Sequence, residues 1–191
     1  MKGLAIATFL GASIASTGCS RADRSAPPAT GEVVDDALLA YLSAARALHH
    51  EADMAEEANN PKASIVALSR ILQSPIPKPA PEIDEVLADT RARLADLRSR
   101  PAAGGEFDAA LRDIDEGLKL VPRTSYLRGH LFEIRGVVLE RRIQSIASVG
   151  DSAATTRMKE DAMKAYEEAI AIQHEVIRAA ATARALDGGK R

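Results

Sequence analysis

From residue 35 onward, apolar side chains recur every three or four positions, and no stretch alternates between apolar and polar residues. This spacing is typical of helices with one buried face, whereas alternation would indicate strands. The expected helices cover residues 35–58, 61–74, 82–100, 106–121, 124–149 and 155–186. The pattern therefore predicts an all-α domain of about six helices.

Prolines mark several of the expected helix ends. Pro61 can occupy the first position of the second helix, where its missing N–H is not needed. Residues 74–82, SPIPKPAPE, carry prolines at alternate positions, which favour an extended backbone over a helix. The third helix then has the cleanest apolar stripe, formed by Ile83, Leu87, Thr90, Leu94 and Leu97.

The fifth expected helix is apolar on two sides. One arc consists of Leu127, Leu131, Ile134 and Val138, and the other of Phe132, Leu139, Ile143 and Ile146. A helix with two apolar sides must be packed on both. Gly129 and Gly136 adjoin the second arc and would permit a close helix crossing.

Two segments share a spacing of small and large residues. The first contains Ala110, Ile114, Gly117 and Pro122, and the second Ala162, Tyr166 and Ala169; a looser third copy contains Ala63, Ala67 and Pro75. This spacing resembles the second helix of the tetratricopeptide repeat (TPR). The resemblance implies three helical hairpins in a row, a fold that presents a groove to partners.

The resemblance to the TPR is partial. The step from Ala110 to Ala162 is 52 residues, against about 34 in the regular repeat. The Trp, Leu-Gly and Tyr signature of the first helix is largely missing, and His174 stands where the last copy would have its proline. A closed bundle of the same six helices is the alternative fold.

Composition narrows the class of protein. Apolar residues make up 46% and aromatic residues 3% of the chain, with no Trp, so Ala, Leu, Ile and Val must build the core. The formal charge of −2 argues against a nucleic-acid binder. A single Cys excludes an internal disulfide and a cysteine-based metal cluster.

The N-terminus has the pattern of a secretory signal. Lys2 precedes an uncharged, largely apolar run that continues to Ser16, and such a run is short for a membrane span, which needs about 20 apolar residues. We expect residues 1–18 to be a signal peptide that is removed. A retained N-terminal anchor is the alternative.

Residues 16–19, Ser-Thr-Gly-Cys, resemble the lipobox of bacterial lipoproteins, although Ser16 stands where Leu is commonest. The resemblance implies that Cys19 is lipidated, with palmitate among the acyl chains, and becomes the N-terminus on the membrane. Cleavage after Ala15 would instead leave a soluble protein with an unused thiol. Ser20 follows the cysteine, rather than the Asp of inner-membrane lipoproteins, which favours the outer membrane facing the periplasm.

Residues 19–34 are expected to be a flexible tether, because Pro27, Pro28, Gly31 and scattered charges cannot build a core. Residues 35–186 then form the TPR-like domain. Gly188 and Gly189 end the last helix, so residues 187–191 are expected to be a disordered C-terminus.

The sequence offers little support for catalysis. His50, Asp53 and Glu57 could share a helix face at metal-binding spacing, but a solvated polar face explains them better. No Gly-x-Ser-x-Gly or phosphate-binding glycine loop occurs in the sequence. We expect no enzyme activity, no catalytic residue, no cofactor, no metal and no small-molecule substrate.

Three arginines recur every seven residues in the fifth helix: Arg128, Arg135 and Arg142. One alternative is pairing within the domain, with Asp113, Glu116 or acids of the last helix, while the side-chain stems pack on apolar neighbours. The other is a basic seam that binds an acidic peptide or an anionic ligand, since guanidinium groups recognise carboxylates.

The function expected from the sequence is that of a membrane-anchored periplasmic lipoprotein. Its TPR-like domain would bind a partner protein or scaffold an envelope complex, and Arg128, Arg135 and Arg142 are the candidate partner-binding residues. The alternative is a structural or accessory subunit of an envelope or secretion assembly, built through helical-bundle interfaces.

Overall fold

A computed structural model describes residues 35–146 and 153–188. The helices are α1 (Asp36–Glu57), α2 (Pro61–Gln73), α3 (Pro81–Ser99), α4 (Phe107–Leu120), α5 (Tyr126–Ile146) and α6 (Ala153–Gly188), with a short 3₁₀ turn, η1 (Pro101–Ala103), before α4. These residues contain no strand, which confirms the all-α prediction. None of these helices is both long and apolar enough to cross a membrane.

Several predictions fall on residues outside these ranges. The signal peptide (1–18), the tether (19–34) with the lipidated Cys19, and residues 189–191 lie outside the part of the chain that the structure describes. At the other end, α6 continues through Asp187 and Gly188, which were expected to follow the last helix.

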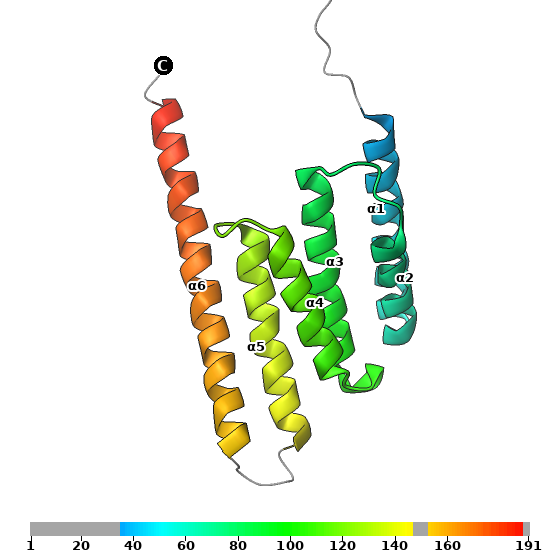
Figure 1. The fold of residues 1–191 in the computed structure, drawn as a ribbon, viewed down its shortest axis with the longest axis vertical. Helices are drawn as coiled ribbons and strands as arrows, with labels where there is room; N and C mark the ends of the chain where they lie inside the picture. The colour runs from blue at the N-terminus through cyan, green and yellow to red at the C-terminus, as the bar shows by residue number, and fades with distance from the viewer. Residues whose placement is uncertain (1–34, 147–152, 189–191) are drawn as a thin grey trace, which may run out of the picture. The chain divides into compact units, whose positions relative to one another are not determined.

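The six helices form three antiparallel hairpins in a row: α1 with α2, α3 with α4, and α5 with α6 (Figure 1). α3 contacts both helices of the first hairpin, and α5 contacts both helices of the second. Within the described helices, the backbones of the first and third hairpins do not approach each other closely. Each hairpin therefore packs mainly on its neighbours, as in a solenoid and unlike a closed bundle.

α3 divides the core into two clusters. The predicted stripe of Ile83, Leu87, Thr90, Leu94 and Leu97 is buried, and its four aliphatic members pack with α1 and α2. The opposite cluster contains Ala88, Ala92 and Ala95 of α3, together with Ala110 and Ile114 of α4 and Leu131 and Val138 of α5. Because alanine projects little beyond the backbone, α4 and α5 can lie close to this side of α3.

Polar and proline residues start the first three helices. The Asp35 carboxylate accepts hydrogen bonds from the Ala37 and Leu38 N–H groups, both at 3.1 Å. Asn60 caps α2 through the Ala63 N–H at 3.1 Å, with Pro61 as the first helical residue, as predicted. α3 likewise starts at a proline, Pro81. These caps satisfy N–H groups that have no partner inside the helix.

The repeat-like positions Ala110, Ile114 and Gly117 of α4 and Ala162 and Ala169 of α6 are buried, whereas Tyr166 is half-buried. In the looser copy of α2, Ala67 is buried. Ala63 is only half-buried, whereas Ser64 is fully buried. The Ser64 hydroxyl donates a hydrogen bond to the Ala52 carbonyl at 3.0 Å, which makes its burial possible. Ser64, Leu68 and Ile71 then reproduce the offsets of four and three seen in α4.

Tyr41 has a buried hydroxyl group without a hydrogen-bond partner among the described residues. Leaving a polar group buried and unpaired costs about 1–3 kcal/mol. We therefore expect Tyr41→Phe to have an unfolding free energy at or above that of the wild type, with a gain of up to about 1 kcal/mol. Urea unfolding followed by circular dichroism measures it. A clear loss of stability would show that the hydroxyl has a partner in solution.

Candidate functional site

The three predicted arginines of α5 all face α4. Arg135 forms an ion pair with Asp115, and Arg142 forms one with Asp108 at 2.9 Å. Since the helices run antiparallel, the next position opposite Arg128 lies beyond the end of α4. Arg128 donates instead to the Leu118 carbonyl at 3.1 Å, which is one of the terminal carbonyls that a helix leaves without an internal partner.

This arrangement corresponds to the first alternative, pairing within the domain, although the partners differ from those expected. Asp113 lies toward α3 and pairs with Arg91 and Arg98, and Glu116 pairs with Lys119. The sequence contains a signal for the true partners, because Asp108 and Asp115 are seven residues apart, as are Arg135 and Arg142. Matching heptad spacings on two helices indicate facing rows of side chains.

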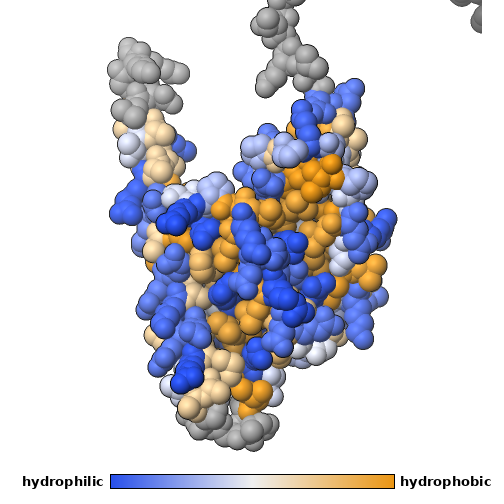
Figure 2. Space-filling view, in the orientation of Figure 1, coloured by the Kyte–Doolittle hydropathy of each residue, from blue (hydrophilic) through white to orange (hydrophobic). Residues whose placement is uncertain are grey.

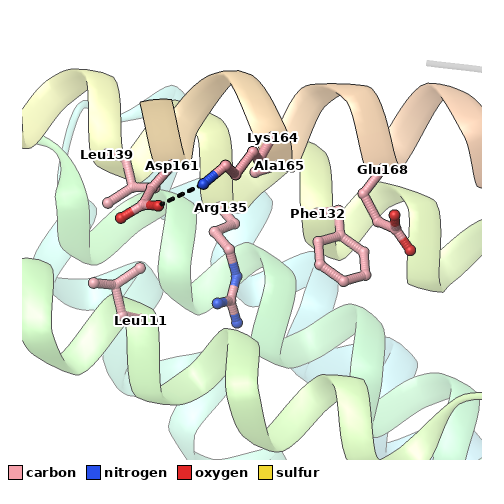
Figure 3. Close-up of a pocket in the computed structure, with 8 residues that line it drawn as sticks. All are labelled: Leu111, Phe132, Arg135, Leu139, Asp161, Lys164, Ala165 and Glu168. Atoms are coloured by element: carbon pink, nitrogen blue, oxygen red, sulfur yellow. Dashed lines mark ion pairs between the residues drawn. The ribbon is translucent and has the colours of Figure 1, made fainter. Parts of the chain in front are cut away.

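A cleft of about 540 Å³ lies between α4, α5 and α6 (Figure 3). Apolar side chains contribute to its lining: Leu111, Phe132, Leu139 and Ala165. Its charged residues are Arg135, Lys164, Asp161 and Glu168, of which Lys164 and Asp161 pair at 4.0 Å. The charges balance, and Arg135 is already paired with Asp115. The α4/α5/α6 cleft therefore offers no excess positive charge to an acidic ligand.

Phe132 supports the arginine row from α5 itself. The guanidinium groups of Arg128 and Arg135 lie 5.7 and 5.8 Å from the centre of its ring. A cation over an aromatic face at this distance is attracted to the ring. Figure 2 shows hydrophilic side chains over much of α4, with hydrophobic surface beside them. Arg135 is thus held within the domain by an ion pair and the Phe132 ring, and Arg128 by a carbonyl hydrogen bond and the same ring.

A second groove, of about 530 Å³, lies between the first helices of the three hairpins, α1, α3 and α5. Its apolar residues are Leu42 and Ala45 of α1, Val86 of α3 and Leu127 of α5. Its polar residues are Arg46, His49, Glu82, Glu85 and Asp89. Sequence reasoning did not identify this groove, because its apolar members follow the same spacing as core residues. Only the packing of alternate helices shows that these buried and partly buried side chains line one groove.

His49 is fixed in the wall of the α1/α3/α5 groove by two hydrogen bonds. Its Nδ1 accepts from the Arg93 guanidinium at 2.9 Å, and its Nε2–H donates to the Thr90 hydroxyl at 3.1 Å. Thr90 in turn donates to the Val86 carbonyl at 2.7 Å. An acceptor at Nδ1 requires the neutral ring. Burial lowers the pKa of His49, against the opposing effect of Asp89, and Arg93 lowers it further.

A lowered pKa for His49 predicts a pH-dependent stability. The unfolded chain takes up this proton as the pH falls through about 6.5, whereas the folded chain takes it up at lower pH. Stability is therefore full above about pH 6.5 and falls between that pH and the folded-state pKa, by at most about 1.4 kcal/mol per pH unit. We expect His49→Gln to lack this component of the slope in urea titrations. Exposed His50→Gln is the matched control, and equal slopes for the wild type and His49→Gln would contradict the assignment.

Charged side chains connect α1, α3 and α5 beside the groove. Arg93 pairs with Asp53 at 2.7 Å and with Glu56 at 2.9 Å. A second set continues the network: Arg100 with Glu56 at 3.0 Å and with Asp96, and Arg141 of α5 with Asp96 at 2.8 Å. Arg93 and Arg141 could not be predicted from the sequence, because their partners lie on other helices. This network fixes the relative positions of the three helices that form the groove.

Within residues 35–146 and 153–188, no group of three His, Cys, Asp or Glu side chains could hold a metal ion. Asp53, one of the residues at metal-like spacing, is engaged by Arg93. Comparison of the chain with protein-family models, curated proteins and solved structures gives no match.

Proposed function

We propose that this protein is a lipid-anchored envelope lipoprotein whose α1/α3/α5 groove binds an exposed segment of a partner protein, without chemistry of its own. The observation that carries the proposal is the groove itself, which combines apolar side chains from three helices with a row of acids. In a row of hairpins, such a groove is continuous across neighbouring units. This arrangement supports the partner binding that the resemblance to the TPR implies.

The charge of the groove indicates the chemistry of the partner. Glu82, Glu85 and Asp89 contribute three carboxylates, against one guanidinium from Arg46, while the hydrogen bonds of His49 require its neutral form. A segment with apolar side chains and flanking Lys or Arg would match both features, since complementary charge favours encounter and specificity. The arginines of α5 are engaged by α4, so we assign partner binding to this groove rather than to them.

Binding is tested by selecting short random peptides on the immobilised protein. We expect the selected peptides to place Lys or Arg beside apolar residues. The double variant Glu82→Lys/Glu85→Lys should weaken their binding at least about tenfold, which corresponds to about 1.4 kcal/mol. The matched control is Glu57→Lys/Glu175→Lys, which changes the net charge equally at exposed sites outside the groove. Equal weakening by both doubles, or no selected peptide, would contradict the proposal.

The anchor is proposed from the N-terminal pattern alone. Lys2, the apolar run and Cys19 with its small preceding residues support it, and stable attachment needs more than one acyl chain. Metabolic labelling with a palmitate analogue tests it. We expect label on the wild type and none on Cys19→Ser, and equal labelling of both would contradict lipidation. Fractionation of the same cells tests the location of the protein. We expect it in the outer-membrane fraction rather than the inner-membrane fraction.

The alternative function, a structural or accessory subunit, is favoured by a different observation. α6 exposes a row of large apolar side chains on its surface.

A further inference from the structure

α6 carries three large apolar side chains on one exposed stripe. Met163, Ile170 and Ile177 are 63%, 56% and 64% exposed. They are seven residues apart, so they lie on the same side of the helix. A different side of α6 packs on α5, through buried Ala162, Ala165, Ala169 and Ile172. Apolar side chains gathered in this way mark an interaction site more often than singly scattered ones do.

α6 also extends well beyond the helix on which it packs. The Gln173 side chain donates to the carbonyl of Tyr126, the first residue of α5, at 3.2 Å. Beyond this point α6 runs on to Gly188, a length of roughly 20 Å, and in Figure 1 its red end passes the neighbouring helices. Residues 177–185 are all exposed. Short helices without tertiary packing are marginally stable in water, so this end would gain from a neighbour.

The stripe is centred on the middle of α6. Ile170 lies midway along Ala153–Gly188, and Met163 and Ile177 are placed symmetrically on either side of it. A two-fold axis at Ile170 would therefore bring two copies of α6 together along their full length. Ile170 would face itself, and Met163 would face Ile177 of the second copy. The free end of each α6 would pack on the first half of the other, a self-complementary interface.

Charges beside the stripe favour the antiparallel orientation. Glu160 and Arg178 are five helical turns apart and lie on the same side of the stripe. Antiparallel pairing about Ile170 brings Glu160 of one copy near Arg178 of the other, twice in the dimer. The same pairing also brings Glu167 of one copy near His174 of the other. Parallel pairing would instead place Glu160 of one copy and Arg178 of the other on opposite sides of the interface, so neither pair could form.

From these observations we propose that the protein forms a homodimer through α6, with two copies of the helix packed antiparallel about Ile170. The apolar stripe supplies the contact, and the Glu160 and Arg178 pairs set its direction and register. Two anchored chains would then present two α1/α3/α5 grooves from one assembly. The proposal does not depend on what those grooves bind.

Disulfide trapping tests the axis directly. A residue on a two-fold axis faces its own copy, so Ile170→Cys in a Cys19→Ser background should yield an oxidised dimer of the full-length protein in mild detergent. Val66→Cys in the same background is the matched control, because Val66 is 61% exposed on α2. Equal cross-linking of the two variants, or none for Ile170→Cys, would overturn the proposal.

Sedimentation of the full-length protein tests the contact and its direction. Ile170→Glu places two like charges at the axis and should weaken dimerisation at least about tenfold, while Val66→Glu should not. Glu160→Arg and Arg178→Glu should each weaken it several-fold, and the double charge swap should restore it. A wild-type monomer at about 100 μM would overturn the dimer. A dimer that the double swap fails to restore would overturn the antiparallel register. Helix content measured by circular dichroism checks that each variant remains folded.

Discussion

Replacing Asp113 with alanine is expected to lower the free energy of unfolding by about 3 kcal/mol. Asp113 is 6% exposed and bridges α4 to two arginines of α3: Arg91 at 3.2 Å and Arg98 at 2.6 Å. Burial raises the pKa of this carboxyl group, and the charges of Arg98 and Arg91 oppose that rise. Without the carboxylate, two partly buried guanidinium groups would lie side by side and lose the acid that bridges them.

Two comparisons separate loss of the bridge from loss of any acid. Glu116→Ala removes an exposed carboxylate of the same helix, paired with Lys119, and should change stability by no more than about 0.5 kcal/mol. Replacing the whole set with apolar residues, as Asp113→Leu, Arg91→Met and Arg98→Leu together, should recover much of the loss, because no buried charge is left unpaired. Urea unfolding measures all three proteins. A small loss for Asp113→Ala would show that solvent reaches both arginines.

Gly136→Ala is expected to destabilise the protein by about 2 kcal/mol, although alanine is the better helix former. A Cβ atom at Gly136 would lie 2.5 Å from the Tyr166 ring of α6, with two further ring atoms within 2.9 Å. A ring packed between two helices cannot move aside without separating them. The structure thereby confirms that the glycines of α5 permit a close helix crossing, as the sequence predicted.

Two further variants provide the controls for Gly136. In a Tyr166→Ala background, Gly136→Ala should become neutral or stabilising, since the ring is gone and the gain in helix propensity of about 1 kcal/mol remains. Gly129→Ala should cost less, because its close neighbour is the end of the flexible Gln173 side chain. Thermal unfolding ranks these proteins. Equal costs at Gly129 and Gly136 would contradict the assigned role of the ring.

The helices and their ends could be predicted because their causes are local. The spacing of Ile83, Leu87, Leu94 and Leu97 requires one buried helix face, and Pro61 begins a helix wherever the fold places it. Pro81, which the proline spacing assigns to the extended run, is instead the first residue of α3. The second buried face of α3 was not predicted. Ala88, Ala92 and Ala95 give a weak apolar signal, and their burial depends on how closely α4 and α5 approach.

The interaction partners of the arginines in α5 could not be predicted from the sequence of that helix alone. Their seven-residue spacing predicts a row but leaves open whether that row meets solvent, a ligand or another helix. The antiparallel register of α4 and α5 places Asp115 and Asp108 opposite Arg135 and Arg142. The α1/α3/α5 groove could not be predicted for the same reason. Leu42, Val86 and Leu127 have the spacing of core residues, yet together they line an accessible groove.

By itself, then, the sequence determined the class of fold and the six helices, since each depends on neighbours within a few residues of the chain. Only the tertiary structure decided which charges neutralise one another, which apolar side chains share a groove and which stripe of α6 remains uncovered. Those outcomes depend on the register and crossing of helices that are far apart in the sequence. Interactions between the helices fix this register, and local residue spacing does not.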